Sequence, residues 1–430
     1  MSDLPVGWTI HRLGDAGGLF ARRVDRYAGV RPYLATSDVN QGKATPSEEF
    51  TYSGRPARAD LLLKVNDVLQ AKMKGTDKAF LVGKAQSGWL ASTGFAQFNP
   101  RTVGNSSRYF LHVLSSRWFL DAKDARCVGS TQQAISDKDL AEIEIAVPPR
   151  LEQAGIADVL DAIDGAIRET EAITVKLAAF KQGLLNDLMT RGIGVNGELR
   201  PPQVEAPHLY KGSPLGWIPK DWSVEPLSHY TASDITYGIV QAGPHVPGGV
   251  PYIRTGDMSG DALIRESMLC TSRRIASSYA RSEVRTGEIV MAIRATVGKV
   301  LPVPLDLDGA NLTQGTARVS PNAKTDGTFL LWAIRHSRAQ RAIQLEIKGT
   351  TFAEITLGAL RQVLVAAPIS LAEQNEIGKR LTVVDERLLV ERESLAKYQS
   401  QKAGLMEDLL TGRVRVKPLP AEAKSEKECA

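Results

Sequence analysis

The sequence predicts an α+β protein that consists of two mixed α/β globular blocks and two long helices, built as an internal repeat with a pseudo-twofold axis. Three observations predict this fold: two stretches of the chain resemble each other at an offset of 221 residues, each ends in a long helical pattern, and each begins with short β-rich runs. The expected domains are a first block at 1–147, a first helix at 148–192, a linker at 193–216, a second block at 217–367, a second helix at 368–413 and a disordered tail at 414–430.

The composition is that of a folded globular protein, with 43% hydrophobic and 23% charged residues in a chain of 430. The sequence lacks a run of about 18 apolar residues and a recognisable secretory signal, so we expect a cytoplasmic protein without a membrane span. Three cysteines are too few for a disulfide framework, which fits a reducing compartment. The net charge of +5 is compatible with a polyanionic partner but is weak evidence for one.

The repeat is clearest in the two helical segments. Twelve of the 39 positions from 152 to 190 carry the same residue 221 positions later, where chance gives about two or three. The identities begin with Glu152-Gln153 on Glu373-Gln374 and end with Thr190 on Thr411. Each copy is therefore one globular block followed by one helix.

Shorter matches extend the repeat upstream with small changes of offset. They are Pro5-x-x-Trp8 with Pro219-x-x-Trp222, Pro32-Tyr33 with Pro251-Tyr252, Asp67-Val68-Leu69 with Glu288-Ile289-Val290, and Val82-Gly83-Lys84 with Val297-Gly298-Lys299. The runs Glu142–Val147 and Glu288–Ile293 are typical of strands, and one helix per copy is predicted, at Tyr109–Ala122 and Phe329–Leu345. The blocks therefore mix helices and strands.

Apolar residues recur in both long segments at alternating spacings of four and three, which is the pattern of a coiled-coil seam. The predicted seam residues are Ile156, Leu160, Ile163, Ile167, Leu177, Leu184, Leu188, Ile377, Leu381, Val384, Leu388, Leu395, Tyr398, Leu405 and Leu409. About 40 residues make a rod of roughly 60 Å. Each seam is covered either by the other helix or by its own block; we expect the two helices to pair as a coiled coil, because related segments of one chain meet at high effective concentration.

Recognisable catalytic signatures are missing from the sequence. The one G-x-G-x-x-G, at Gly192–Gly197, follows a helix and opens a linker, which indicates a helix end rather than a nucleotide-binding loop. Asp326, Glu346 and Lys348 have the residue types of a nuclease site, but Glu346 ends a predicted helix. The six histidines lack zinc spacing, so we expect neither a catalytic nor a metal site in this chain.

The repeated helix opens with Leu-x-Glu-Gln or Leu-Glu-Gln and closes with Lys-x-Gly-Leu-(Leu/Met)-x-Asp-Leu-(Met/Leu)-Thr, and each block opens with Pro-x-x-Trp. This combination resembles the DNA specificity subunit of Type I restriction-modification systems, over residues 4 to about 416.

The resemblance implies that each block is a target recognition domain that reads one half of a bipartite duplex DNA sequence. It further implies that the two helices form an antiparallel coiled coil, which fixes the gap between the half-sites and docks two modification (methyltransferase) subunits. Restriction subunits would be further partners. S-adenosylmethionine, ATP and magnesium would then be cofactors of those partners, and this chain would bind none. A self-contained DNA-modifying enzyme and a coiled-coil scaffold that binds nucleic acid without sequence preference are the alternatives.

Duplex DNA requires basic side chains in register with its phosphates, and the two blocks carry an equal local excess of +4 in windows 50–84 and 271–305. The candidate DNA-binding residues in these windows are Arg55, Arg58, Lys72, Lys74, Lys78, Lys84, Arg273, Arg274, Arg281, Arg285, Arg294 and Lys299. The alternative is a solvated basic face without a partner.

A polar loop before a predicted strand is the second DNA-binding candidate in each block. It contains Ser130, Thr131 and Gln132 in the first copy and Thr350 and Thr351 in the second. Hydroxyl and amide groups suit hydrogen bonds to base edges or phosphates, although they also suit an ordinary turn.

Overall fold

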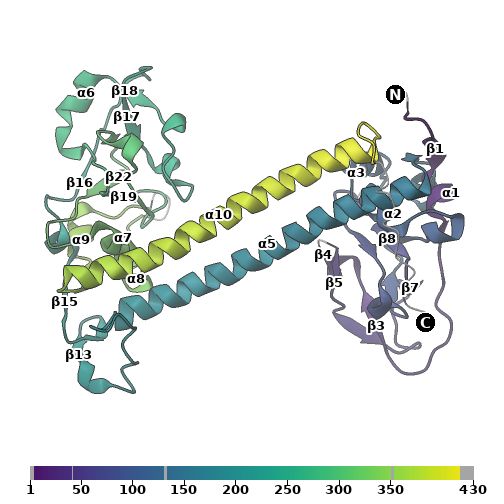
Figure 1. The fold of residues 1–430 in the computed structure, drawn as a ribbon, viewed down its shortest axis with the longest axis horizontal. Helices are drawn as coiled ribbons and strands as arrows, with labels where there is room; N and C mark the ends of the chain where they lie inside the picture. The colour runs from purple at the N-terminus through teal and green to yellow at the C-terminus, as the bar shows by residue number, and fades with distance from the viewer. Residues whose placement is uncertain (1–3, 41, 130–132, 350–352, 417–430) are drawn as a thin grey trace, which may run out of the picture. The chain divides into compact units, whose positions relative to one another are not determined.

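A computed structural model describes residues 4–40, 42–129, 133–349 and 353–416. The chain forms two compact units, the first made of the residues up to 171 together with those from 393 on, and the second made of residues 172–392. Each unit contains one globular block and a part of both long helices, α5 (Arg150–Arg191) and α10 (Leu371–Leu410) (Figure 1). The predicted α+β fold with two blocks and two long helices is confirmed. Within the described ranges, no helix has both the length and the apolar content needed to cross a membrane.

The block of the first unit contains two four-stranded sheets, in the orders β6-β3-β10-β7 and β2-β11-β8-β9, and the pairs β1-β12 and β4-β5. Its strands are β1 (Thr9–Arg12), β2 (Leu19–Phe20), β3 (Arg31–Leu34), β4 (Val39–Asn40), β5 (Lys43–Ala44), β6 (Glu48–Phe50), β7 (Ala59–Leu62), β8 (Val68–Ala71), β9 (Ala79–Leu81), β10 (Leu90–Ser92), β11 (Phe95–Phe98) and β12 (Glu144–Val147). Its short helices are α1 (Leu13–Gly17), α2 (Ser107–Leu114), α3 (Arg117–Ala125) and α4 (Asp137–Ala141).

The block of the second unit contains a four-stranded sheet β16-β22-β19-β20, a three-stranded sheet β18-β17-β21, and the pairs β15-β23 and β13-β14. Its strands are β13 (Tyr210–Ser213), β14 (Gly216–Pro219), β15 (Trp222–Pro226), β16 (Thr236–Tyr237), β17 (Val250–Ile253), β18 (Cys270–Thr271), β19 (Ile289–Ala292), β20 (Val300–Pro302), β21 (Asn311–Leu312), β22 (Thr316–Val319) and β23 (Leu364–Pro368). Its short helices are α6 (Arg273–Ser278), α7 (Gly327–Arg335), α8 (Ser337–Leu345) and α9 (Leu357–Gln362).

The two blocks share one strand order. The order β2-β11-β8-β9 in the first corresponds to β16-β22-β19-β20 in the second, and the parallel pair β3-β10 corresponds to β17-β21. The strand registers also show that one pair of residues is matched wrongly in the sequence repeat. Ala71 N donates to Lys78 O and Ala292 N donates to Lys299 O, so Lys299 corresponds to Lys78 and the predicted match with Lys84 is wrong.

The sequence predicts one helix in this part of each block, but the structure has two. In the first block the break falls at Ser116, whose extended backbone opens α3 and whose hydroxyl donates to Val113 O over 2.6 Å. In the second, His336 has the same extended conformation between α7 and α8. The apolar periodicity continues through both breaks, which is why the pattern alone predicts one helix.

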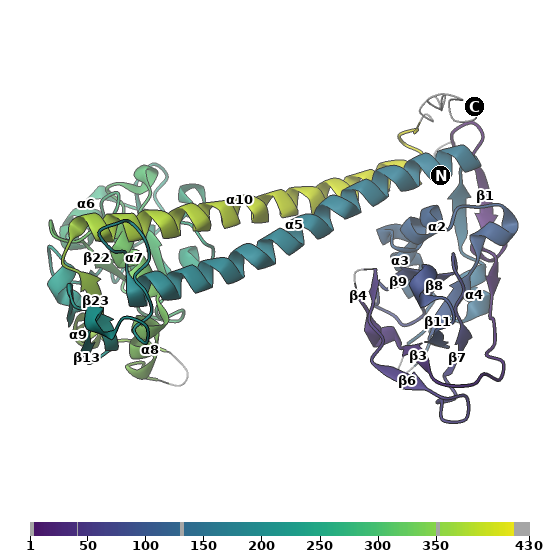
Figure 2. The same cartoon turned by 60° about the horizontal axis from the view of Figure 1, so that its bottom comes forward.

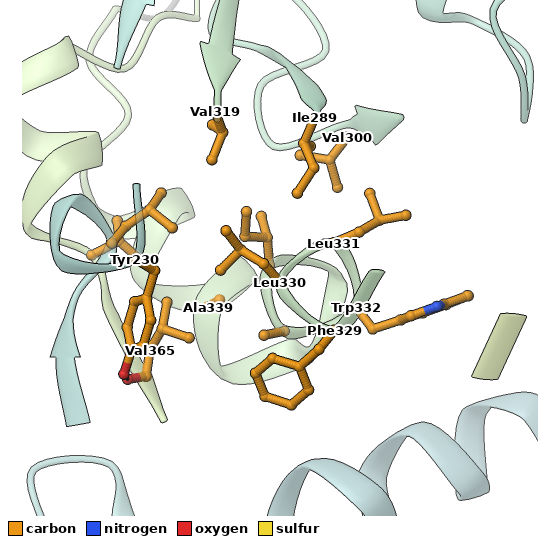
Figure 3. Packing of buried hydrophobic residues seen from close by; sticks show 14 of the residues in the cluster. Tyr230, Ile289, Val300, Val319, Phe329, Leu330, Leu331, Trp332, Ala339 and Val365 are labelled. Carbon is orange, nitrogen blue, oxygen red and sulfur yellow. The ribbon is translucent and has the colours of Figure 1, made fainter. Parts of the chain in front are cut away.

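The core of the second unit forms around α7, an almost wholly apolar helix. Leu330 and Leu331 face Ile289, Val300 and Val319 of the sheet (Figure 3). Burial of one such side chain contributes about 1.5–3 kcal/mol, which fixes the sheet against the helix.

The long helices run antiparallel within each unit. In the second unit Lys181 Nζ lies 2.9 Å from Asp385 Oδ1, and twelve residues later Ile193 N donates to Glu373 Oε1, so the residue numbers rise on α5 and fall on α10. In the first unit the equivalent ion pair joins Lys402 and Asp164 over 2.6 Å. The lysine comes from α5 in the second unit and from α10 in the first, so the two copies exchange roles in this pair (Figure 2 shows both helices from a second direction).

The predicted seam residues are all buried or half-buried. At the helix ends they join the block cores: Ile156, Leu160 and Leu409 lie in the first core, and Leu188 and Ile377 in the second. The others, from Ile163 to Leu405, are mostly half-buried along the helices. Each block core is therefore completed by the start of one long helix and the end of the other.

The glutamate of the Glu-Gln motif fastens each helix start to the Pro-x-x-Trp opening of its own copy. Trp222 Nε1 donates to Glu373 over 3.1 Å, and Trp8 Nε1 donates to Glu152 over the same distance. An arginine that follows the other copy's helix completes each site. Arg200, after α5, donates to both carboxylate oxygens of Glu373 over 2.6 and 3.1 Å.

Arg415, after α10, donates to both oxygens of Glu152 over 2.6 and 2.8 Å. Such bidentate charge-assisted hydrogen bonds are among the stronger polar contacts in proteins. Residues 414–416, expected in the disordered tail, thus include a packed contact, whereas 417–430 lie outside the described residues.

The glutamine of the motif holds the backbone of its own block. Gln153 Oε1 accepts from Ser106 N, which caps α2, and its Nε2 donates to Pro148 O at the end of β12. Gln374 does the same with Asp326 N, which caps α7, and with Pro368 O. The repeated motif is therefore the joint between helix and block.

Glycines end both long helices. Gly192 (φ +63°) and Gly412 (φ +75°) have left-handed backbones, and a Cβ at Gly192 would lie 2.7 Å from the Trp222 ring. The first glycine of the G-x-G-x-x-G motif therefore ends α5 and packs on Trp222. The segment expected as a linker continues through Arg200 into the hairpin β13-β14.

Candidate nucleic-acid interface

Half of the candidate cations in the first block are engaged by groups of the protein. Arg55 pairs with Asp60 over 3.1 Å, Lys72 with Asp137 over 3.0 Å, and Lys78 Nζ donates to Thr36 O over 2.8 Å. The exposed cations Arg58, Lys74 and Lys84 have no ion-pair partner among the described residues. These three keep their full charge for a phosphate.

The second block divides in the same way. Arg285 pairs with Glu283 over 2.8 Å, Arg294 with Glu354 over 3.0 Å, and Lys299 with Asp261 over 3.6 Å. The other three candidates are exposed and have no carboxylate partner in the described chain: Arg273 and Arg274, which open α6, and Arg281, which lies in the 3-10 turn Ala280–Ser282. Each block therefore has three candidate cations without a carboxylate partner among the described residues.

In each block the structure places the basic turn against residues that flank the polar loop. The turn after β8 pairs with the stem of the polar loop: Met73 bridges to Ala134, and Lys74 N donates to Gln133 O over 2.9 Å. The turn after β19 repeats this contact, with Arg294 bridging to Glu354. The loop residues themselves, Ser130, Thr131, Gln132, Thr350 and Thr351, lie outside the described residues.

A fully buried lysine supports the basic turn of the first block. Lys123 Nζ donates to Met73 O over 3.0 Å and to Thr76 O over 2.9 Å, and lies 3.1 Å from an oxygen of Asp124. A buried ammonium needs such acceptors. The sequence pattern places Lys123 on a helix but does not indicate its burial, because partners 47 and 50 residues away leave no local signal.

A second buried charge stabilises the β19-β22 sheet. Glu288 accepts from Arg318 Nε over 2.7 Å and lies 2.5 Å from its Nη2. Burial acts to raise the pKa of Glu288, but the hydrogen bonds from Arg318 and the neighbouring groups outweigh it and leave the pKa below its ordinary value. Glu288 therefore stays ionised at neutral pH and leaves Arg318 without free charge for DNA.

The residues weighed for catalysis have structural contacts. Asp326 caps α7, its Oδ1 accepting from Phe329 N over 2.7 Å, and Glu346 caps the end of α8. In the part of the chain that the structure describes, no three His, Cys, Asp or Glu side chains gather as a metal site would require.

Comparison with protein families gives a match to each copy of the repeat. A family model described as "Type I restriction modification DNA specificity domain" matches residues 5–178 and again 242–397. The two matches cover most of the chain and fall one on each copy of the repeat.

Two curated relatives carry related names. The chain is 24% identical over 428 residues to the Type I restriction enzyme MjaVIII specificity subunit of Methanocaldococcus jannaschii, covering 97% of this chain and 95% of that protein. It is 27% identical over 310 residues to the Type I restriction enzyme EcoBI specificity subunit of Escherichia coli, covering 68% of this chain and 60% of that protein.

Two solved structures have the same fold. A Type I restriction-modification system S subunit from M. genitalium matches with a TM-score of 0.61 at 14% identity, over 95% of this chain and 97% of that one. A chain from a structure on complex assembly and conformational transition of the type I R-M system matches with a TM-score of 0.51 at 20% identity, over 96% of this chain and all of the other.

Proposed function

Because the chain belongs to the Type I restriction modification DNA specificity family, we propose that each of its two blocks reads one half of a bipartite duplex DNA target. The chain is a sequence-specific DNA recognition subunit, and its duplicated architecture supports a two-part site. The single observation that carries the proposal is the double family match, one on each copy of the repeat.

The unpaired cations support separate roles for the cations and the polar loop of each block. Arg58, Lys74 and Lys84 in the first and Arg273, Arg274 and Arg281 in the second would contact phosphates and position the block on the duplex. The hydroxyl and amide groups of the polar loops would then hydrogen-bond to the bases. The expected result is an affinity that falls steeply with salt for any DNA and a preference for one sequence on top of it.

In this proposal the catalytic reactions are carried out by partner subunits. The chain would dock two methyltransferase subunits that use S-adenosylmethionine to methylate adenine, and restriction subunits that use ATP and magnesium. It would act in the cytoplasm, where those partners meet chromosomal DNA. None of these cofactors would bind to the specificity subunit itself.

Selection from a duplex library with a randomised 20-base-pair centre tests the proposal. The purified full chain should enrich a sequence of two fixed parts separated by a gap of constant length. Retention of DNA without any enriched sequence would contradict the proposal and support the non-specific scaffold. Assembly with candidate methyltransferase subunits, followed by mapping of methylated adenines, would test the partners separately.

We also propose that the long helices set the gap between the half-sites. A heptad inserted into α5 alone, between Glu171 and Ala172, lengthens that helix by about 10.5 Å relative to α10. The expected result is loss of the original target or a changed gap in the library selection. The same seven residues inserted after the exposed Val204 serve as the control. An unchanged gap in the α5 variant would show that the helices do not set it.

A further inference from the structure

The block of the second unit contains an open pocket of about 330 Å³, and Arg294 is the one residue that its lining shares with the basic window 271–305. Three separate segments form its polar side: Arg254 and Thr255 after β17, Arg294 after β19, and the turn Thr313–Gly315 between β21 and β22. Ile239, Val240 and Ala242 supply its apolar lining.

Backbone hydrogen bonds fix the pocket walls. Arg254 N donates to Asp257 Oδ2 over 2.9 Å, Ile293 N donates to Gly315 O over 2.9 Å, and Ala295 N donates to Ala353 O over 3.0 Å. Gln314 N in turn donates to Ile239 O over 3.1 Å. The walls are therefore preorganised for a ligand.

The pocket contains hydrogen-bonding groups without protein partners. The exposed Gln314 side chain makes no hydrogen bond to any described residue, and Arg294 Nε is buried without an acceptor in the described chain. Arg254 is held by Asp257 through Nε (3.0 Å) and Nη2 (2.7 Å), so its remaining Nη1 is available. A pocket with these groups offers donors from two arginines and both a donor and an acceptor from one amide.

The first block has the same frame with different side chains. Ala35 N donates to Asp38 Oδ2 over 2.9 Å, Lys72 N to Gly94 O over 3.0 Å, and Lys74 N to Gln133 O over 2.9 Å, which repeats the three wall contacts. Through these contacts the positions of Arg254, Arg294 and Gln314 correspond to Ala35, Met73 and Thr93. All three positions differ, although Thr36 and Asp38 of the frame match Thr255 and Asp257.

We propose that this pocket receives purine edges in the major groove of the second half-site, and that Gln314 reads an adenine there. A glutamine amide donates to adenine N7 and accepts from its N6 amino group, and arginine donates to guanine O6 and N7. In the first block Ala35, Met73 and Thr93 offer two apolar side chains and one hydroxyl, which suit a thymine methyl group. The two blocks would thus read different half-sites through one frame. The inference depends on the proposed function, because it requires that the second block binds DNA.

A change of Gln314→Glu provides a sharp test, because a carboxylate accepts from the cytosine N4 amino group and no longer donates to adenine N7. In the library selection with the full chain, the variant should replace adenine by cytosine at one position of one half-site. Discrimination at that position should change about tenfold or more, and the other half-site should be unchanged. Thr93→Ala should alter only the other half-site.

Gln344→Glu is the matched control, since it makes the same chemical change on an exposed position of α8 outside the pocket, and it should leave the selected sequence unchanged. An unchanged target for Gln314→Glu, or weaker binding with unchanged base preference, would overturn the inference while the proposed function stands. A wild-type chain that enriches no sequence would overturn both. Circular dichroism of each variant verifies that it is folded.

Discussion

The change Glu373→Gln is expected to destabilise the second unit by about 3 kcal/mol, because it removes the buried carboxylate of the ion pair and leaves Arg200 with only the exposed Asp221 as a charged partner. Only 9% of the Glu373 side chain and 11% of the Arg200 side chain are exposed. The carboxylate accepts from three partners: the Arg200 guanidinium, the Trp222 indole and Ile193 N. A glutamine at position 373 keeps one acceptor oxygen, but its NH₂ group would face these hydrogen-bond donors.

Hydrogen–deuterium exchange with peptide resolution is the measurement, because one melting curve mixes the transitions of two units. Amides at 193–200, 222–226 and 371–377 should exchange roughly 100-fold faster, which is the rate equivalent of about 3 kcal/mol. Peptides around Glu152 should be unchanged.

Glu376→Gln provides the control for the same substitution in an exposed ion pair, in which Arg380 Nε lies 2.7 Å from Glu376, and it should cost no more than about 0.5 kcal/mol. Equal exchange in both variants would show that the buried carboxylate does not stabilise the joint.

Combined alanine substitution of Arg273, Arg274 and Arg281 is expected to weaken binding to every DNA sequence and to flatten its salt dependence. Each lost phosphate contact reduces the slope of log affinity against log salt by about 0.9, so three contacts reduce it by about 2.7. Between 50 and 200 mM salt the wild type should then lose roughly 40-fold more affinity than the variant. Fluorescence anisotropy with a labelled duplex over this salt range measures the slope.

Arg285→Ala is the matched control in the same window. Its guanidinium lies 2.8 Å from Glu283 and 3.5 Å from Asp308, so its charge is already opposed by two carboxylates. We expect a much smaller change of slope than for one of the unpaired arginines. If the triple variant keeps the wild-type slope, these arginines do not contact phosphates.

The sequence predicts the repeat, the two long helices and the strands because these depend on local periodicity and on identical residues at one offset. The Glu-Gln motif and the Pro-x-x-Trp opening are visible as repeated letters. Their contact is not, because Trp222 and Glu373 are 151 residues apart and only the folded chain brings them together. Periodicity also fails at Ser116, where a hydroxyl-to-carbonyl hydrogen bond breaks a helix whose apolar pattern continues.

The candidate interface is only partly predictable for a related reason. Charge counts locate the basic windows, but they do not separate Arg281 from Arg285, because Glu283 is two residues from both and only the folded chain shows that it pairs with Arg285. Arg254 and Gln314 are 60 residues apart and gain their common position from the parallel pairing of β17 with β21. Lys78 and Lys299 are equivalent only through the hairpin registers, which a comparison of similar letters misses.

The contact of Arg415 with Glu152 has a consequence for biosynthesis. The two residues are 263 positions apart, so a ribosome that adds roughly 5–20 residues per second makes them about 13 to 50 seconds apart. Residues 172–392 are contiguous and can fold as they emerge, whereas the earlier-made amino-terminal block must wait for residues 393–416. During that interval Glu152 can accept from Trp8 but lacks Arg415, and the part of the first core that Leu409 and Leu410 later complete stays open to solvent.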